Sequence, residues 1–297
     1  MSGLKEVRIR IASVKSTRQI TSAMKMVAAS KLRKAQNAII TLRPYAAKLN
    51  EIMQNLSSSL ENSDEGRFAE DRGEHKVLIV AITSNRGLCG GFNINVVKQV
   101  ISLIEEKYKA QYKKGNVKIL AIGKKGDDLL RAKGFDSDEK IFKIFEHLTF
   151  EDSVPIAENL MNSFVNKDYD KIILVYNQFK NAAVQILQTE PFLPVTGNED
   201  GNKDVEIKSV KADYIFEPSK EEILEALVPK AIKLKLFKAL LDSFAAEHGA
   251  RMTAMHKATD NANELLKELN LSYNKARQAA ITKEILEIVS GAEALNG

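Results

Sequence analysis

The feature that most constrains the fold of this chain is a heptad pattern that runs from residue 4 to residue 56. Alternating steps of three and four residues trace a seam along this segment, and all but three of its positions are apolar. A period of 3.5 residues sustained over so many turns predicts a coiled-coil helix. At about 1.5 Å per residue it would extend roughly 80 Å. No single compact domain accommodates such a helix, so it requires a partner helix.

The three polar seam positions are consecutive, at Arg18, Thr21 and Lys25. Around this break the apolar residues move off the seam, to Ile20, Met24 and Val27. We interpret the break as a local change of partner, where the helix stops facing its coiled-coil mate and faces something else.

A second long helical pattern runs from Lys220 to Leu295, with weak interruptions at Pro229 and Gly249. In the first helix, Pro44 is expected to cause a kink or to remove one backbone hydrogen bond. Two long helices at opposite ends of a chain, joined through a globular domain, can pair only antiparallel. The predicted seam of the second helix includes Leu241, Phe244, Met255, Ala258, Ala262, Leu265, Leu269, Tyr273, Ala276 and Ala280.

Between the two long helices, short apolar runs rich in β-branched residues alternate with helical patterns. The expected strands are Val77–Thr83, Val117–Gly123 and Lys171–Tyr176, with Ala182–Gln188 as the second strand of a hairpin. The expected helices are Asn95–Lys114, Lys124–Lys133 and Val154–Val165, the last with Pro155 near its first turn. This alternation is typical of a parallel α/β sheet of the Rossmann-like kind.

The predicted fold is therefore an α/β domain combined with a long antiparallel coiled coil, in which the N- and C-terminal helices form a two-stranded shaft. The predicted parts are an N-terminal coiled-coil helix (1–57), a linker (58–75), a central Rossmann-like α/β domain (76–195), a second linker (196–212) and a C-terminal coiled-coil helix (213–297).

The positive charge is concentrated in the first helix. The whole chain has a net charge of +5, yet residues 1–50 carry eleven Lys and Arg residues against one acid, Glu6. This imbalance implies an acidic partner surface, nucleic acid or lipid headgroups. The lone Cys89 cannot form an internal disulfide, which fits a reducing cytoplasm. No apolar run approaches the roughly 18 residues of a membrane span, and no secretory signal is expected.

The loop Ser84–Asn93 lies where an α/β fold binds nucleotides, after the first strand and before a helix. Its glycine spacing fits neither phosphate-binding fingerprint. We therefore expect a tight structural turn in which glycine lets the backbone pass close to a neighbour, with Cys89 as a small buried residue. No metal site is expected, because no histidine has metal-ligand spacing. No catalytic or cofactor site is expected either, because the chain has no G-x-S-x-G, no kinase-like element and no local Cys-His-Asn signature. The four histidines are His75, His147, His248 and His256.

Two other classes of protein compete with a protein-binding shaft. A basic coiled-coil nucleic-acid-binding protein would use the cationic helix, although residues 1–44 lack aromatic residues for base stacking. An α/β nucleotide enzyme would use the central domain but leave both long helices unexplained.

Several motifs resemble those of one family, the gamma subunits of bacterial F-type ATP synthases. They cover both ends and the middle of the chain, in order: Ile11–Val14, Ile20–Lys31, Arg43–Tyr45, Ser84–Asn93, Arg251–Met255, Ala258–Ala262, Tyr273–Thr282 and Glu287–Ala292.

The resemblance implies a non-catalytic rotor shaft inside a ring of three α and three catalytic β subunits. Its foot would stand on the c-ring beside the epsilon subunit, so that ion-driven rotation changes the β conformations for ATP synthesis or hydrolysis. The α/β domain would bind epsilon and not nucleotide, no nucleic acid would bind, and the chain would reach the cytoplasmic face of the inner membrane only through the complex. The absence of an inserted cysteine pair excludes thiol control of this subunit and favours a non-photosynthetic bacterial origin.

The resemblance also assigns contact residues. Those implied to touch the β subunit are Met24, Lys25, Arg251, Arg277, Gln278 and Thr282. Those implied to lie at the foot, near epsilon or the c-ring, are Tyr214, Glu217 and Pro218.

Overall fold

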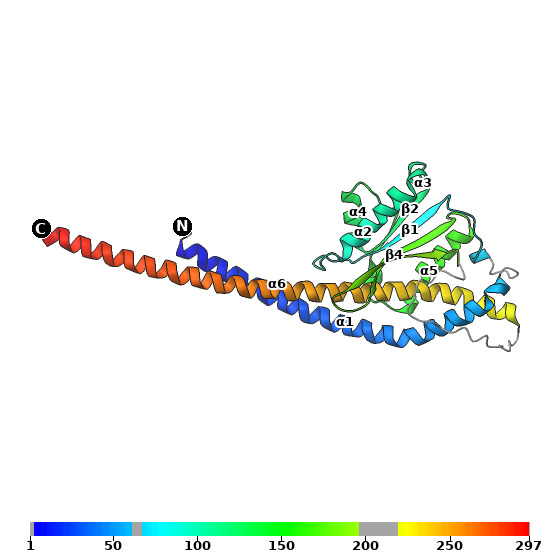
Figure 1. The fold of residues 1–297 in the computed structure, drawn as a ribbon, viewed down its shortest axis with the longest axis horizontal. Helices are drawn as coiled ribbons and strands as arrows, with labels where there is room; N and C mark the ends of the chain where they lie inside the picture. The colour runs from blue at the N-terminus through cyan, green and yellow to red at the C-terminus, as the bar shows by residue number, and fades with distance from the viewer. Residues whose placement is uncertain (1–2, 61–66, 196–218, 297) are drawn as a thin grey trace. The chain divides into compact units, whose positions relative to one another are not determined.

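The computed structural model describes residues 3–60, 67–195 and 219–296, and the chain forms two compact units. Unit 1 combines residues 1–29 with 251–297, and unit 2 comprises residues 30–250. Two long helices dominate the chain, α1 (Leu4–Leu60) and α6 (Lys220–Asn296) (Figure 1). Both predicted long helices are confirmed, and each continues through its internal proline, Pro44 in α1 and Pro229 in α6.

Unit 2 contains a five-stranded sheet in the order β3-β2-β1-β4-β5. Strands β1 to β4 are parallel, and β5 runs antiparallel to β4. The strands are β1 (Val77–Ile82), β2 (Val117–Ile122), β3 (Glu139–Ile141), β4 (Lys171–Phe179) and β5 (Gln185–Leu193). The three predicted strands are confirmed, and so is a hairpin partner for β4, which begins at Gln185 and not at Ala182 and extends to Leu193. The prediction missed β3, because its three residues Glu-Lys-Ile form no apolar run.

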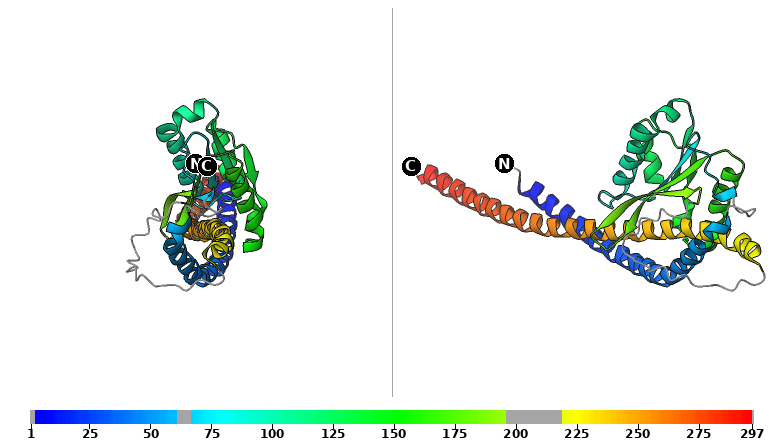
Figure 2. Two further views of the ribbon diagram at one scale, coloured as in Figure 1. Left: turned by 90° about the vertical axis from the view of Figure 1, so that its right-hand side faces the viewer. Right: turned by 45° about the vertical axis from the view of Figure 1, so that its right-hand side comes forward.

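The sheet is covered on both faces. Helices α2 (Phe92–Ser102) and α4 (Lys124–Ala132) lie on one face, and α5 (Phe150–Val165) lies on the other (Figures 1 and 2). Alternate residues of β1 serve the two faces: Leu78 and Val80 join a core with α5 and α6, whereas Ile79 joins one with α2. A strand buried on both sides reads as a continuous apolar run, which explains why it was visible in the sequence.

Two predicted helices differ in detail. The helix expected at Asn95–Lys114 is divided into α2, a π-helical turn at Leu103–Lys107 and α3 (Lys109–Lys113). The helix predicted at Val154–Val165 begins four residues earlier, at Phe150. The Thr149 hydroxyl caps it by accepting a hydrogen bond from the Asp152 amide at 3.2 Å. Pro155 therefore lies in the second turn of α5, not near the first as predicted.

In unit 1, α1 and α6 pack along heptad seams. The α1 seam is as predicted, with Val7, Thr21 and Ala28 buried and the intervening positions partly buried. The α6 seam follows a different phase from the prediction at two points. It passes through Thr259 and Leu266, and Leu265 is 44% exposed. At the second point, the adjacent Leu265 and Leu266 made either phase consistent with the sequence.

A buried carboxyl in unit 2 gives the fold a pH dependence. Burial raises the pKa of Asp242 to about 6; Lys238 and Arg43 oppose this rise and Glu190 adds to it. A carboxyl with a raised folded pKa contributes stability below its unfolded pKa of about 3.9, and that contribution is lost as the pH rises through the folded value. Asp242 therefore destabilises the folded chain at neutral pH.

We expect Asp242→Asn to raise the free energy of unfolding by about 2–3 kcal/mol near pH 7.5, because the amide avoids burying a charge. The gain should shrink by about half near pH 5. Urea unfolding of the full chain at both pH values measures this, with the exposed Asp136→Asn as the control. An equal gain at both values would contradict the assignment.

Candidate functional site

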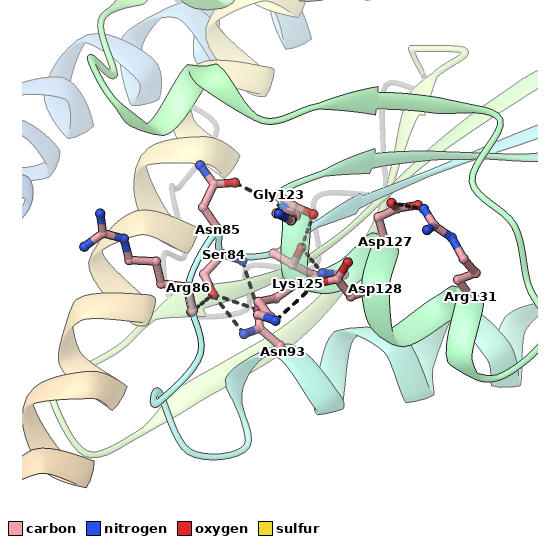
Figure 3. A network of polar contacts seen from close by, with 12 residues as sticks. Ser84, Asn85, Arg86, Asn93, Gly123, Lys125, Asp127, Asp128 and Arg131 are labelled. Atoms are coloured by element: carbon pink, nitrogen blue, oxygen red, sulfur yellow. Dashed lines mark hydrogen bonds and ion pairs between the residues drawn. The ribbon is translucent and has the colours of Figure 1, made fainter.

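The first candidate is the loop after β1, which forms a closed polar network (Figure 3). The Ser84 amide donates to Asn93 Oδ1 at 2.9 Å, and Asn93 Nδ2 donates to Ser84 Oγ at 2.8 Å and to Cys89 Sγ at 3.2 Å. All three residues are buried. The prediction that Cys89 is a small buried residue is confirmed.

The same loop caps the N-terminus of α4. The Lys124 amide donates to Asn85 Oδ1 at 3.1 Å, the Lys125 amide to Ser84 O at 2.9 Å, and the Gly126 amide to Thr83 Oγ1 at 3.0 Å. Free amides at a helix N-terminus are what an α/β fold offers to a phosphate. Here these three amides already bond to acceptors within the chain, so the N-terminus of α4 packs against the loop after β1.

Two glycines outside the predicted turn allow the start of α4 to pack closely against Thr83. A Cβ at Gly123 would lie 2.3 Å from Thr83 O, and one at Gly126 would lie 2.4 Å from Thr83 Oγ1. The prediction that glycines inside Ser84–Asn93 allow a close approach is wrong for Gly87 and Gly90, because nothing lies within 4 Å of a Cβ there. Gly90 instead supplies a positive φ of 60° for the turn.

The second candidate is the helix pair of unit 1, where polar side chains cross the seam. Arg18 Nη1 donates to Asn263 Oδ1 at 3.2 Å. The hydroxyls of Thr21 and Thr259 bond at 2.8 Å. Lys25 Nζ lies 3.3 Å from His256 Nδ1. We call these three pairs the polar rungs.

The polar rungs overturn one prediction. We expected α1 to stop facing its mate at Arg18, Thr21 and Lys25, but all three residues face α6 and bond to it. A polar group can remain in a seam when the opposite helix supplies a matching donor or acceptor. The displaced apolar residues do face away from the seam: Ile20 is 57% exposed and Val27 is 58% exposed.

A fourth polar contact lies nearer the end of the helix pair. Arg8 Nη2 donates to the Tyr273 hydroxyl at 2.9 Å. This hydrogen bond and the charge of Arg8 lower the pKa of Tyr273. The same hydrogen bond and the charge of the Tyr273 phenolate raise the pKa of Arg8.

The residues that the resemblance assigned to β-subunit contact have different surroundings. Met24 is partly buried, and the partly buried Lys25 belongs to a polar rung. Arg251 is only 7% exposed. By contrast, the three residues near the end of α6 are exposed: Arg277, Gln278 and Thr282. The residues predicted at the foot, Tyr214, Glu217 and Pro218, lie outside the described residues.

The sequence shows an apolar stripe near the end of α6, but sequence reasoning did not predict which of its large side chains are exposed. Their signal was an apolar pattern that continues after the seam of α1 has run out. Contiguous exposed apolar surface marks sites of protein interaction. These side chains are Ile281, Ile285, Leu286, Ile288 and Val289.

Neither a membrane-spanning helix nor a metal site is found in the described part of the chain. No helix there is long and apolar enough to cross a bilayer. Nor do three or more His, Cys, Asp or Glu residues gather there as a metal site would require.

Comparison with known proteins gives matches over the whole chain. Residues 3–295 match the family described as ATP synthase. The "ATP synthase gamma chain" of Flavobacterium johnsoniae is 58% identical over 298 residues, covering 100% of both chains. That of Christiangramia forsetii is 56% identical with the same coverage, and that of Chlorobium phaeobacteroides is 44% identical, also over 100% of both chains. The resemblance found in the sequence motifs is confirmed.

Solved structures agree on the fold. A chain of the Tetrahymena thermophila mitochondrial ATP synthase central stalk and c-ring structure is 26% identical, with a TM-score of 0.58, covering 80% of this chain and 99% of that one. A chain of the Euglena gracilis mitochondrial ATP synthase in rotational state 3 is 22% identical, with a TM-score of 0.65, covering 98% of this chain and 94% of that one.

The packing of α4 against β1 yields a stability prediction. We expect Gly126→Ala to lower the free energy of unfolding by about 1–3 kcal/mol, because its Cβ displaces the Thr83 hydroxyl from the Gly126 amide. Gly87→Ala, where a Cβ meets open space, should change it by less than about 0.5 kcal/mol. Urea unfolding of the two variants checks this, and equal effects would refute the packing role of Gly126.

Proposed function

This chain belongs to the ATP synthase gamma chain family, and from that premise we propose how it works in its complex. It is a non-catalytic subunit, the central stalk of the rotor. In the proposal, ion flow turns a c-ring, the chain turns with it, and each orientation favours a different conformation at the catalytic β subunits, by population shift. Its partners are three α and three β subunits, epsilon and the c-ring, at the cytoplasmic face of the bacterial inner membrane.

The observation that carries this proposal is the uncovered end of α6 in unit 1. Helix α1 begins at Leu4, and α6 continues beyond the part of it that pairs with α1 (Figure 1). This stretch exposes Ile281, Ile285 and Ile288 to solvent. A single helix with such side chains is expected to be covered by a partner. The proposed partner is the inner surface of the ring of α and β subunits.

Polar residues beside this apolar surface would make the directed contacts. Arg277, Gln278 and Thr282 are exposed on the same stretch of α6, and we assign them to the β subunit. A second β contact would lie on α1 at Met24 and Lys25, beside the exposed Ile20 and Val27. The basic side chains of α1 would face an acidic segment of β. Arg251, although buried, lies on α6 and is assigned to the same β-contact surface as Arg277 and Gln278.

The remaining assignments rest on the resemblance. Tyr214, Glu217 and Pro218 would contact epsilon or the c-ring at the foot. The α/β domain would bind epsilon. Its α4 amides, already bonded within the chain, support a protein-binding role for that domain over a phosphate-binding one.

The experiment that tests the whole proposal is affinity purification of the tagged chain from native membranes, followed by an ATPase assay. We expect α and β subunits in excess over the tagged chain, with ATPase activity in the complex and none in the chain alone. Recovery of the chain alone, or with nucleic acid, would instead favour the basic coiled-coil nucleic-acid-binding protein.

The assigned β contact has its own test. Arg277→Ala with Gln278→Ala should lower coupled ATP synthesis by about threefold or more, because a few anchoring side chains carry most of an interface's energy. The matched control is Lys267→Ala with Asn270→Ala, which removes a cation and an amide from an exposed part of the same helix. Unchanged synthesis in membranes carrying the first variant would remove both residues from the contact.

A further inference from the structure

The polar contacts between α1 and α6 in unit 1 follow one constant register. In each bonded pair the two residue numbers sum to 280 or 281. This holds for Arg8–Tyr273 and for each of the three polar rungs. Four contacts distributed over several turns therefore agree on one antiparallel alignment.

The apolar layers of the same helix pair follow this alignment but cannot select it. Continuing the register outward from the Thr21–Thr259 pair places Val14 opposite Leu266 and Ile11 opposite Leu269, all partly buried. If α1 moved along α6 by one helical turn, about 5.4 Å, apolar side chains would again meet apolar side chains. Hydrophobic packing is non-directional, so these layers discriminate weakly between the two alignments.

Hydrogen bonds discriminate strongly, because donor and acceptor must be a fixed distance apart. Thr21 is 8% exposed and its hydroxyl lies 2.8 Å from that of Thr259. One turn away, Thr21 would face Met255 or Ala262, whose side chains cannot bond to it, and its hydroxyl would keep only the bond to the Arg18 carbonyl in its own helix. Polar residues in coiled-coil seams are known to specify register at a cost in stability.

We propose that the polar rungs fix the axial register of α1 against α6 in unit 1. Their residues act as positioning residues: they keep the two helices from sliding past each other when a load is applied along or around them. This role differs from the β-subunit contact assigned to Lys25, because the Lys25 ammonium is directed at His256 on the neighbouring helix.

Disulfide trapping in the full chain reads out the register directly. In a Cys89→Ala background, Val14→Cys with Leu266→Cys reports the observed alignment, and Val14→Cys with Leu269→Cys reports an alignment shifted by about one turn. Cysteines whose Cα atoms lie more than about 7 Å apart cannot be bridged without backbone movement. The ratio of shifted to in-register product after mild oxidation is the measurement.

The rung-free variant removes the bonding groups and keeps the apolar layers. It carries Thr21→Val, Thr259→Val, His256→Ala and Asn263→Ala. The matched control removes four exposed polar side chains from the same two helices, by Ser13→Ala, Ser16→Ala, Asn261→Ala and Asn270→Ala. Helicity and the thermal midpoint are recorded for both, so that loss of the fold is distinguished from loss of register.

We expect the rung-free variant to remain helical while the ratio rises about tenfold or more, as the loss of two or more ordinary hydrogen bonds implies. The control should leave the ratio unchanged. Restoring hydroxyls with Thr21→Ser and Thr259→Ser should return the ratio most of the way. A rung-free variant that stays folded with an unchanged ratio overturns the proposal, as does an equal rise in the control. If the rung-free variant unfolds, Thr21→Val with Thr259→Val alone decides the question, because valine preserves the shape of threonine.

The consequence for coupling rests on the proposed function and is measured separately. In membranes with the assembled complex, the rung-free variant should lower ATP synthesis more than it lowers ATP hydrolysis. Register loss in the isolated chain with normal synthesis would leave the register inference intact and contradict the proposed torque transmission. An unchanged register with normal synthesis would overturn only the inference.

Discussion

The mutual coverage of α1 and α6 is the constraint on which unit 1 depends. A lone helix in water is held by weak propensity, and most helical stability in proteins comes from packing one face. Each helix of this pair offers only a narrow seam, with residues such as Val7 on α1 and Ala262 on α6 buried. Neither segment has a sheet or a second layer in unit 1 to pack against, so each is the other's core. The alignment of the pair therefore decides which residues of each helix face outward and are available to partners.

In unit 2 the loop after β1 of the Rossmann-like sheet is bonded to a neighbouring helix. The sheet is covered on both faces, and the loop after β1 occupies the position where related architectures bind phosphate. In this chain Thr83 and Asn85 accept from the amides at the start of α4, and Gly123 and Gly126 are glycine because Thr83 fills the space of a side chain. These contacts hold the loop after β1 against the start of α4.

Sequence patterns predicted elements whose signal is local, and failed where the partner is remote. The strands β1, β2 and β4 were visible because burial on both faces makes them continuously apolar. The three-residue β3 and the π-helical turn at Leu103–Lys107 leave no periodic signature. The break at Thr21 was misread because its partner, Thr259, lies in the other long helix. Nor did periodicity identify the proposed β-contact residues: the assignment of Arg277 and Gln278 to the β subunit came from the family resemblance.

The segment of α1 from Arg18 to Val27 inverts the usual arrangement of a helix at a surface. Its polar Thr21 is buried against α6, while the apolar Ile20 and Val27 are more than half exposed. An inverted segment lowers the stability of the isolated chain. Its apolar side chains are exposed to water, and the hydrogen bonds in the seam do no more than offset the cost of burying polar groups there. Such a segment becomes favourable once a second protein covers the outer side. In the proposed function, the polar rungs hold the inner side in one alignment while the outer side contacts successive β subunits.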